Sequence, residues 1–215
     1  MSAASIKPIK LYRSIVSGHA HRAELFLSLL GLPYEAVDID LRAGQQKSEE
    51  FLRLNPFGQV PVIDDAGTIV SDSNAILVYL ALKYGGDTWL PRDPVGASNV
   101  QRWLSVAAGE IAFGPGLARI GKQFGRPVNM EAAASLAHRL FNLMELHLQE
   151  RAYLASGHPT IADIAAYSYI ARAPEGDVSL DAYPALRAWL QRIEALPRFL
   201  PMIELVKPAA SANAA

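Results

Sequence analysis

The sequence contains no cysteine. The chain therefore cannot form a disulfide, a zinc–thiolate site or an iron–sulfur cluster, and it has no cysteine nucleophile of its own. Any thiol chemistry that the protein performs requires a thiol supplied by another molecule.

An excess of charge of one sign is also lacking. The chain has 20 Lys and Arg against 21 Asp and Glu, a net charge of −1 with histidine neutral, and the basic residues are spread along its length. The electrostatic footprint of a nucleic-acid-binding protein is therefore missing. We expect the partners to be small molecules or a second copy of the chain.

No hydrophobic run is long enough to span a bilayer. The most apolar stretches, residues 25–32 and 161–171, are too short or too interrupted, and the N-terminus has no apolar signal-peptide core. We therefore expect a cytoplasmic protein without a membrane partner.

Glycine and proline are also few, with 15 Gly and 14 Pro among 215 residues. This is well below the share of about 25–30% that marks low-complexity or disordered chains. A folded chain of this length buries about 70% of its unfolded surface, as one large domain or two small ones. The protein can thus build a hydrophobic core without disulfides or structural metals.

The N-terminal part of the chain mixes strand and helix patterns. Residues 10–12 form a short candidate strand, and Val37, Ile39 and Leu41 alternate with aspartates in the period-two pattern of a half-buried strand. Between them, residues 20–30 carry apolar side chains at helical spacing, and Gly31 stands where a helix commonly ends. This order predicts a strand–helix–strand unit.

A strand–strand–helix unit follows. The apolar residues 61–63 and 68–70 flank the turn-forming sequence of residues 64–67, which predicts a β-hairpin. Residues 74–83 then have the pattern of a helix that is apolar nearly all round.

The second half of the chain has a different pattern. Residues 84–94 contain two Gly and two Pro that interrupt any periodicity, which is typical of an interdomain linker. Beyond them, apolar residues recur at helical spacing, as Val100, Trp103 and Ala107 do. We therefore expect two domains, residues 1–84 and 95–215, joined by a linker over 85–94, the second domain being entirely helical.

Two neighbouring segments carry a resemblance to a known family. Residues 55–63 read Asn-Pro-Phe-Gly-Gln-Val-Pro-Val-Ile, and residues 71–76 read Ser-Asp-Ser-Asn-Ala-Ile. Together they resemble the signature of the glutathione S-transferase family, with Asp72 where that family usually has Glu. The other motifs that are similar to the family are Leu11-Tyr12, Ser17-Gly18, Thr160-Ile161-Ala162-Asp163 and Ala173-Pro174-Glu175-Gly176.

The resemblance is to the bacterial, serine-type members, similar to the theta and nu classes, and it covers nearly the whole chain. It implies an α/β thioredoxin-like N-terminal domain followed by an all-α C-terminal domain. It also implies a homodimeric enzyme that activates the thiol of glutathione, its co-substrate, for attack on small electrophiles, as in detoxification.

The same resemblance implies how the middle of glutathione is held. In the family the proline at the position of Pro61 is cis, and the backbone N–H and C=O of the preceding residue, here Val60, stay unpaired at the edge of the sheet. These groups would pair with the cysteinyl residue of glutathione as a short added strand.

The two charged ends of glutathione would lie further along this edge. The resemblance implies that Ser73 binds the γ-glutamyl carboxylate at a helix N-terminus and that Asp72 binds the γ-glutamyl ammonium. It also implies that the glycyl carboxylate is bound by Gln46, Lys47 and Gln59. Simpler roles stay open, because Ser and Asp are also preferred helix N-caps and Lys47 fits an exposed loop.

Ser17 is the candidate catalytic residue, because it resembles the active-site serine of the serine-type classes just before the first helix. A hydroxyl donor and a helix N-terminus both stabilise a thiolate. His19 is a candidate second donor, and Tyr12 is the alternative, since it aligns with the tyrosine of the tyrosine-type classes. Ser14 or the backbone alone remain possible activators, and Ser17 also fits a plain N-cap.

Two further readings of the function stay open. A glutathione thiolate can attack a disulfide or a peroxide without any protein cysteine, which gives a glutathione-dependent reductase or peroxidase. A non-catalytic interaction module on the same fold is the alternative from another class. No metal is expected, because His19 and His21 have no further ligands in register.

Overall fold

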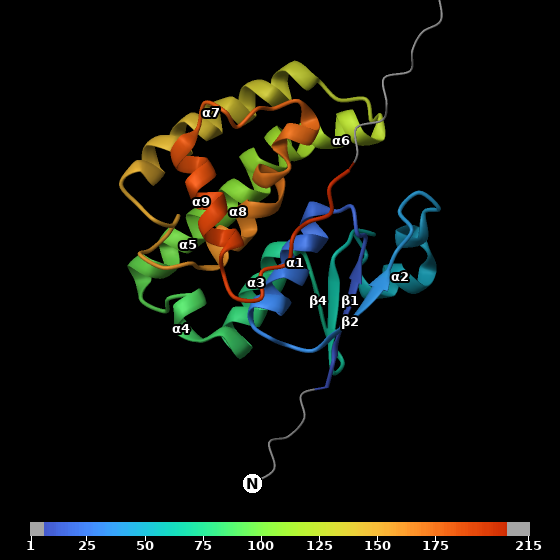
Figure 1. Ribbon diagram of the computed structural model, residues 1–215. Coiled ribbons are helices and arrows are strands. Elements are labelled where there is room, and N and C mark those ends of the chain that lie inside the picture. Colours follow the sequence, from blue (N-terminus) through green and yellow to red (C-terminus); the bar gives the residue numbers. More distant parts are fainter. Residues whose placement is uncertain (1–6, 206–215) are drawn as a thin grey trace, which may run out of the picture.

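The computed structural model describes residues 7–205, which form a small sheet with helices and a bundle of helices beside it (Figure 1). The N-terminal elements, in order, are β1 (Ile9–Arg13), α1 (Gly18–Leu29), β2 (Tyr34–Asp38), α2 (Glu49–Leu54), β3 (Val62–Asp65), β4 (Thr68–Ser71) and α3 (Ser73–Leu80). The strands lie in the order β2-β1-β3-β4; β1 and β2 are parallel, and β3 is antiparallel to both β1 and β4. This is the expected thioredoxin-like arrangement.

The predicted hairpin is confirmed. Ala66 and Gly67 both have positive φ, at 51° and 95°, which is the geometry that a two-residue turn between twisted strands requires. The side chain of Asp64 accepts a hydrogen bond from the Gly67 amide at 2.7 Å and holds the turn. The hairpin therefore brings α3 back to the sheet directly after β4.

The strand predicted through Leu41 is shorter than expected, because β2 ends at Asp38. Asp40 turns the chain: its carboxylate accepts hydrogen bonds from the amides of Arg42 and Ala43, at 2.9 and 3.0 Å. An aspartate that bonds the backbone two residues on favours a turn over a strand. The Ile39 amide still donates to the Arg13 carbonyl at 2.7 Å, so within the alternating pattern only Leu41 lies beyond the hydrogen bonds to β1.

The expected linker is partly helical. The chain leaves α3 through a π-helical turn (Ala81–Gly85) and enters the short helix α4 (Gly86–Trp89) before α5 begins at Pro94. The Trp89 ring packs edge-on against Phe26 of α1, with 5.1 Å between ring centroids. The boundaries of the two domains themselves stay a prediction.

Beyond residue 93, every regular element that the structure describes is a helix, as the spacing of apolar residues predicts. These elements are α5 (Pro94–Val106), a π-helical segment (Ala107–Gly116), α6 (Leu117–Phe124), α7 (Met130–Gln149), α8 (Ile161–Ala171), a 3₁₀ turn (Ala173–Gly176) and α9 (Pro184–Glu194). Helix α8 lies in the middle of this bundle, and ten of its residues are buried (Figure 1). It starts with a capping box in which the Thr160 amide donates to Asp163 at 2.9 Å.

Helix α1 lies between the sheet and the helical bundle. It contacts α3 on one side and α8 on the other (Figure 1). His21 of α1 is buried, with Nδ1 2.9 Å from the hydroxyl of Ser168 in α8 and Nε2 2.9 Å from the carbonyl oxygen of Leu200. Leu200 belongs to the segment after α9 that runs back beside α1. Helix α1 thus packs against α3, α8 and the segment after α9, all of which lie far away in sequence.

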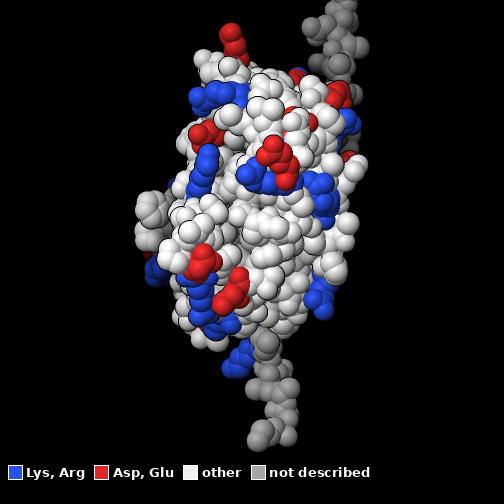
Figure 2. Space-filling model, turned by 90° about the vertical axis from the view of Figure 1, so that its left-hand side faces the viewer, with Lys and Arg blue, Asp and Glu red and all other residues white. Residues whose placement is uncertain are grey.

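The face of the molecule in Figure 2 shows no concentration of one charge. Lys, Arg, Asp and Glu are intermixed over the face in Figure 2. Among the described residues, no helix is both long enough and apolar enough to cross a membrane.

The buried His21 predicts an acid-sensitive fold. Burial, with a smaller contribution from Arg172, lowers the pKa of His21 to about 4, although the Leu200 carbonyl opposes the shift. The unfolded chain therefore takes up the proton first as pH falls, so this stability is full above pH 6.5 and is lost toward pH 4. We expect the free energy of unfolding to fall between these pH values by about 3 kcal/mol more than in His21→Gln. Urea unfolding of both proteins at each pH checks this, and parallel curves would contradict it.

Candidate active site

Ser17 lies where β1 leads into α1. Its amide donates to the carbonyl of Ser14 at 2.9 Å, and its Oγ accepts a hydrogen bond from the amide of Ala20 at 3.3 Å. Ser17 is therefore the N-cap of α1, and its half-buried side chain lies at the positive end of the helix dipole. Because Oγ accepts from the helix, the hydroxyl hydrogen remains available for an anionic acceptor.

Gly18 is required by the close approach of α8. A Cβ at this position would come within 2.7 to 3.0 Å of the Tyr169 ring. Tyr169 is buried, and burial raises the pKa of its phenol, while the backbone amides of Gly18 and His19 face the hydroxyl. The helical bundle thus holds the first turn of α1 in place.

Tyr12, the alternative activator, lies in the middle of the sheet. It is paired with Val37 on one side and Val62 on the other. Its half-buried ring packs edge-on against Phe51 of α2. Ser14 is buried at the end of β1.

The loop before β3 carries the signature of residues 55–63. The Val60–Pro61 peptide is cis, as expected. Within the described part of the chain, the backbone N–H and C=O of Val60 have no hydrogen-bond partner. Asn55 is buried and orders the loop, since its amide donates to the Gln59 carbonyl at 2.8 Å and its oxygen accepts from the Phe57 amide at 3.1 Å.

Asp72 is the N-cap of α3, so the helix starts one residue before the expected Asn74. Its Oδ1 accepts hydrogen bonds from the amides of Asn74 and Ala75, both at 2.9 Å. Its backbone has φ 74° and ψ 128°, a conformation that is strained for any residue other than glycine. Strain of this kind is often retained at binding sites, and here it presents the start of α3 and Ser73 to the loop of Val60.

Ser73 joins α3 to α1 through a buried arginine. Arg22 of α1 donates from Nη1 to the Ser73 hydroxyl oxygen and to the Asn74 side-chain oxygen, both at 3.0 Å. The side-chain amide of Asn74 in turn donates to the Leu104 carbonyl in α5 at 3.0 Å. The Ser73 oxygen accepts from a guanidinium, so its own hydrogen can be donated, either to Nδ1 of the neighbouring His19 at 3.3 Å or to a ligand.

Arg22 is a buried cation that has no ion-pair partner among the described residues. It is fully buried, and its Nε and Nη2 have no hydrogen-bond partner among the described residues. Burial lowers the pKa of its guanidinium to about 10, which leaves it charged at neutral pH. None of the described carboxylates forms an ion pair with it, although the charge of Asp72 acts on it favourably without direct contact. A buried, unpaired cation is costly, so an anion bound at Ser73 would stabilise it.

His19 faces Ser73. Its Nδ1 lies 3.3 Å from the Ser73 hydroxyl, and its ring packs edge-on against Tyr169. Burial and the charge of Arg22 lower the pKa of His19 to about 3, so the ring is neutral at physiological pH. The structure thus groups His19 with Ser73, and its role as a second donor to a thiolate stays a prediction.

The remaining predicted residues lie on two adjoining loops. Lys47 is exposed and donates to the Phe57 carbonyl at 3.2 Å, which ties it to the loop that carries the exposed Gln59. Gln46 donates to the Leu41 carbonyl at 3.4 Å, while its buried side-chain oxygen has no partner within residues 7–205. Among the described residues, no three acidic or histidine side chains form a group that could hold a metal ion.

Sequence reasoning missed Arg22 and Tyr169. The signal for Arg22 is that it is a charged residue in α1, a helix in which nearly every position from Gly18 to Leu29 is buried. Tyr169 leaves no such signal, because a tyrosine within a buried helix is common in protein cores.

Comparison with known proteins agrees with this geometry. Residues 7–82 match the family "Glutathione S-transferase, N-terminal domain", and residues 114–197 match "Glutathione S-transferase, C-terminal domain". A probable glutathione S-transferase of Oryza sativa subsp. japonica is 30% identical over 94% of this chain and 99% of its own. Glutathione S-transferase theta-2 of Rattus norvegicus is 29% identical over 87% of this chain and 81% of its own.

Solved structures show the same similarity. A glutathione S-transferase from Pseudomonas fluorescens has a TM-score of 0.87 and 34% identity, and the alignment covers 92% of this chain and all of that one. A glutathione transferase homologue from Drosophila mojavensis, solved with bound glutathione, has a TM-score of 0.80 and 29% identity over 88% of this chain and 89% of its own. The chain therefore belongs to the glutathione S-transferase family.

Proposed function

We propose that this protein is a glutathione transferase that uses the thiolate of bound glutathione to attack small electrophiles. The observation that carries the proposal is the meeting of two helix N-termini. His19 in the first turn of α1 reaches Ser73 in the first turn of α3 across 3.3 Å. Each helix N-terminus favours an anion, and glutathione brings a carboxylate and a thiolate.

The tripeptide fits this edge of the sheet from end to end. Its γ-glutamyl carboxylate accepts from Ser73, with the charge of Arg22 directly behind, and its ammonium pairs with Asp72. Its cysteinyl backbone pairs with the free N–H and C=O of Val60. Its glycyl carboxylate lies toward Lys47, Gln59 and Gln46.

Catalysis consists of thiolate stabilisation. A free thiol with a pKa near 8.5 is only about a few per cent ionised at neutral pH. A lowering of the thiol pKa by about 2 units requires roughly 2.7 kcal/mol. The Ser17 hydroxyl and the N-terminus of α1 together supply stabilisation of this size. The proton leaves to solvent, and the electrophile is attacked by the bound thiolate.

Substitution of Ser17 tests the activation. We expect Ser17→Ala to bind glutathione but to raise the pKa of its thiol by about one unit, with kcat/KM at pH 7 falling about tenfold. Calorimetry gives the binding, and thiolate absorbance across pH gives the pKa. Tyr12→Phe is the matched control and should behave as wild type. A raised pKa in Tyr12→Phe alone would assign activation to the tyrosine.

Substitution of Arg22 tests the carboxylate end. Arg22→Lys keeps the charge but loses the planar donor fork, so we expect the dissociation constant for glutathione to rise about tenfold. Ser73→Ala should have a similar effect, and the two together should be less than additive because they act on one carboxylate. Arg102→Lys, on the exposed face of α5, is the control. Equal binding by Arg22→Lys and wild type would exclude this role.

The same titration separates the alternative functions. A wild-type protein that binds no glutathione would support a non-catalytic interaction module. A protein that lowers the thiol pKa, but turns over disulfides or peroxides and no electrophile, would be a glutathione-dependent reductase or peroxidase. The cytoplasmic location stays a prediction.

We also propose that the protein is a homodimer. A shallow groove between α3 and α5 offers apolar surface for a second copy, and its lining includes Ala75, Val78, Leu104 and the exposed Leu82. We expect light scattering after size exclusion to give twice the chain mass at micromolar concentration. A monomer would contradict the proposal.

A further inference from the structure

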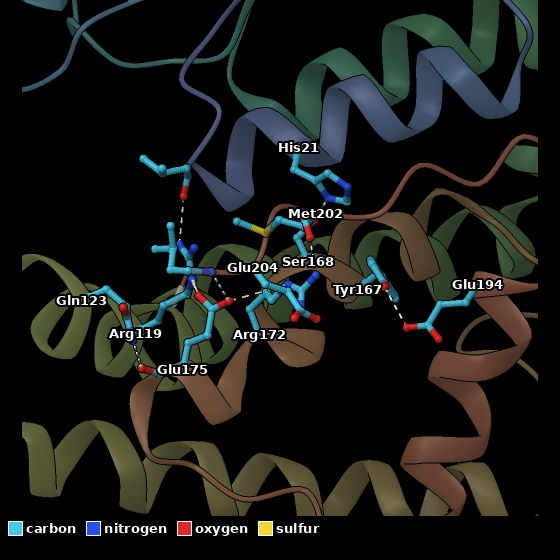
Figure 3. A network of polar contacts seen from close by, with 12 residues as sticks. His21, Arg119, Gln123, Tyr167, Ser168, Arg172, Glu175, Glu194, Met202 and Glu204 are labelled. Atoms are coloured by element: carbon cyan, nitrogen blue, oxygen red, sulfur yellow. Dashed lines mark hydrogen bonds and ion pairs between the residues drawn. The ribbon is translucent and has the colours of Figure 1, made fainter. Parts of the chain in front are cut away.

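A second buried arginine reaches the candidate active site from the helical bundle. Arg119 of α6 is 1% exposed. Its Nη1 donates to the carbonyl oxygen of Val16 at 2.9 Å, and its Nε donates to the Glu175 carboxylate at 2.6 Å. Figure 3 shows Arg119 and Glu175 side by side beneath the start of α1. Val16 directly precedes Ser17, although it lies 103 residues from Arg119 in sequence.

Glu175 is itself held rigidly. One carboxylate oxygen accepts from Arg119, and the other accepts from the Leu205 amide at 3.1 Å. Gln123 of α6 donates to the Glu175 carbonyl at 2.6 Å (Figure 3). A Cβ at Gly176 would lie 2.6 Å from the Arg119 amide nitrogen, so glycine permits the turn to pack directly on α6. The guanidinium therefore has a fixed position from which to bind Val16.

The Val16 carbonyl belongs to the same peptide group as the Ser17 amide. That amide donates to Ser14 at 2.9 Å while the carbonyl accepts from Arg119 at 2.9 Å. Both ends of the peptide plane are thus fixed, one by the loop and one by the helical bundle. The orientation of this plane decides where the Cα of Ser17, and hence its hydroxyl, is placed.

We infer that Arg119 is a positioning residue for thiol activation, which acts on Ser17 through the Val16 carbonyl. The inference rests on the proposed function of Ser17. The effect is geometric, because the charge of Arg119 is compensated by Glu175 in direct contact. A guanidinium suits the task, since its planar fork binds a carboxylate and a carbonyl together, which an ammonium does not do with the same geometry.

The test removes the ion pair as a unit. Loss of one partner would leave a buried charge uncompensated, whereas replacement of both partners is much better tolerated. Arg172, whose Nε lies 3.8 Å from Glu175, keeps its ion pair with Glu204 at 2.7 Å. The variant is therefore Arg119→Met with Glu175→Gln. The matched control is Lys122→Met with Asp177→Asn, which removes an exposed ion pair between the same helix and the residue after the same turn. Melting curves confirm that each protein is folded.

We expect the double variant to bind glutathione as wild type does, because Val60, Ser73 and Arg22 are untouched. Its kcat/KM at pH 6.5 should fall about tenfold, and the loss should disappear at high pH, as the thiol pKa has risen. The control should keep the wild-type pH profile. In a Ser17→Ala background the same pair of substitutions should have no further effect, since Arg119 acts through Ser17.

The possible results separate the positioning role of Arg119 from the proposed function. A wild-type pH profile in the double variant, or an equal loss in the Ser17→Ala background, would overturn the positioning role and leave the proposed function intact. A wild-type protein that does not lower the thiol pKa would overturn both. If the double variant does not fold, Arg119→Lys replaces it, and the same rise in thiol pKa at unchanged glutathione affinity is expected.

Discussion

Burial of α1 between the sheet and α8 is the constraint on which the candidate site depends. Gly18 allows the Tyr169 ring to approach the first turn, and His21 is bonded to Ser168 one turn later. With α1 fixed on this side, Arg22 reaches Ser73 on the other. The N-termini of α1 and α3 therefore meet because of packing beneath them, and no covalent constraint or metal is needed to explain it.

Two buried arginines approach the site from different parts of the molecule, and their pairing differs. Arg119 is compensated by Glu175 and also donates to the backbone of Val16, although its Nη2 has no partner among the described residues. Arg22 bonds only neutral oxygens and retains two unpartnered nitrogens within the described structure. A compensated arginine stabilises a conformation, whereas an uncompensated one creates affinity for an anion. This difference is the reason why we propose a positioning role for Arg119 and an anion-binding role for Arg22.

Much of the fold and part of the site were predictable from the chain alone. The hairpin, the helical second half and the cis peptide before Pro61 are confirmed. The strand through Leu41 was wrong, because the turn chemistry of Asp40 overrides an alternating pattern. The segment over 84–94 carries helical turns that its Gly and Pro content conceals, since Trp89 packs on Phe26.

The sequence by itself determined the features that form within a few residues: the caps at Ser17 and Asp72, the capping box at Thr160 and the hairpin turn. Tertiary structure alone decided which polar groups meet. His19 turns to Ser73, Arg22 to Asn74, and Arg119 to Val16, across 54, 52 and 103 residues of chain. Local hydrogen bonds depend on residue type and spacing, which a sequence displays. Contacts between distant segments depend on how the helices pack, and that is settled only when the whole core is assembled.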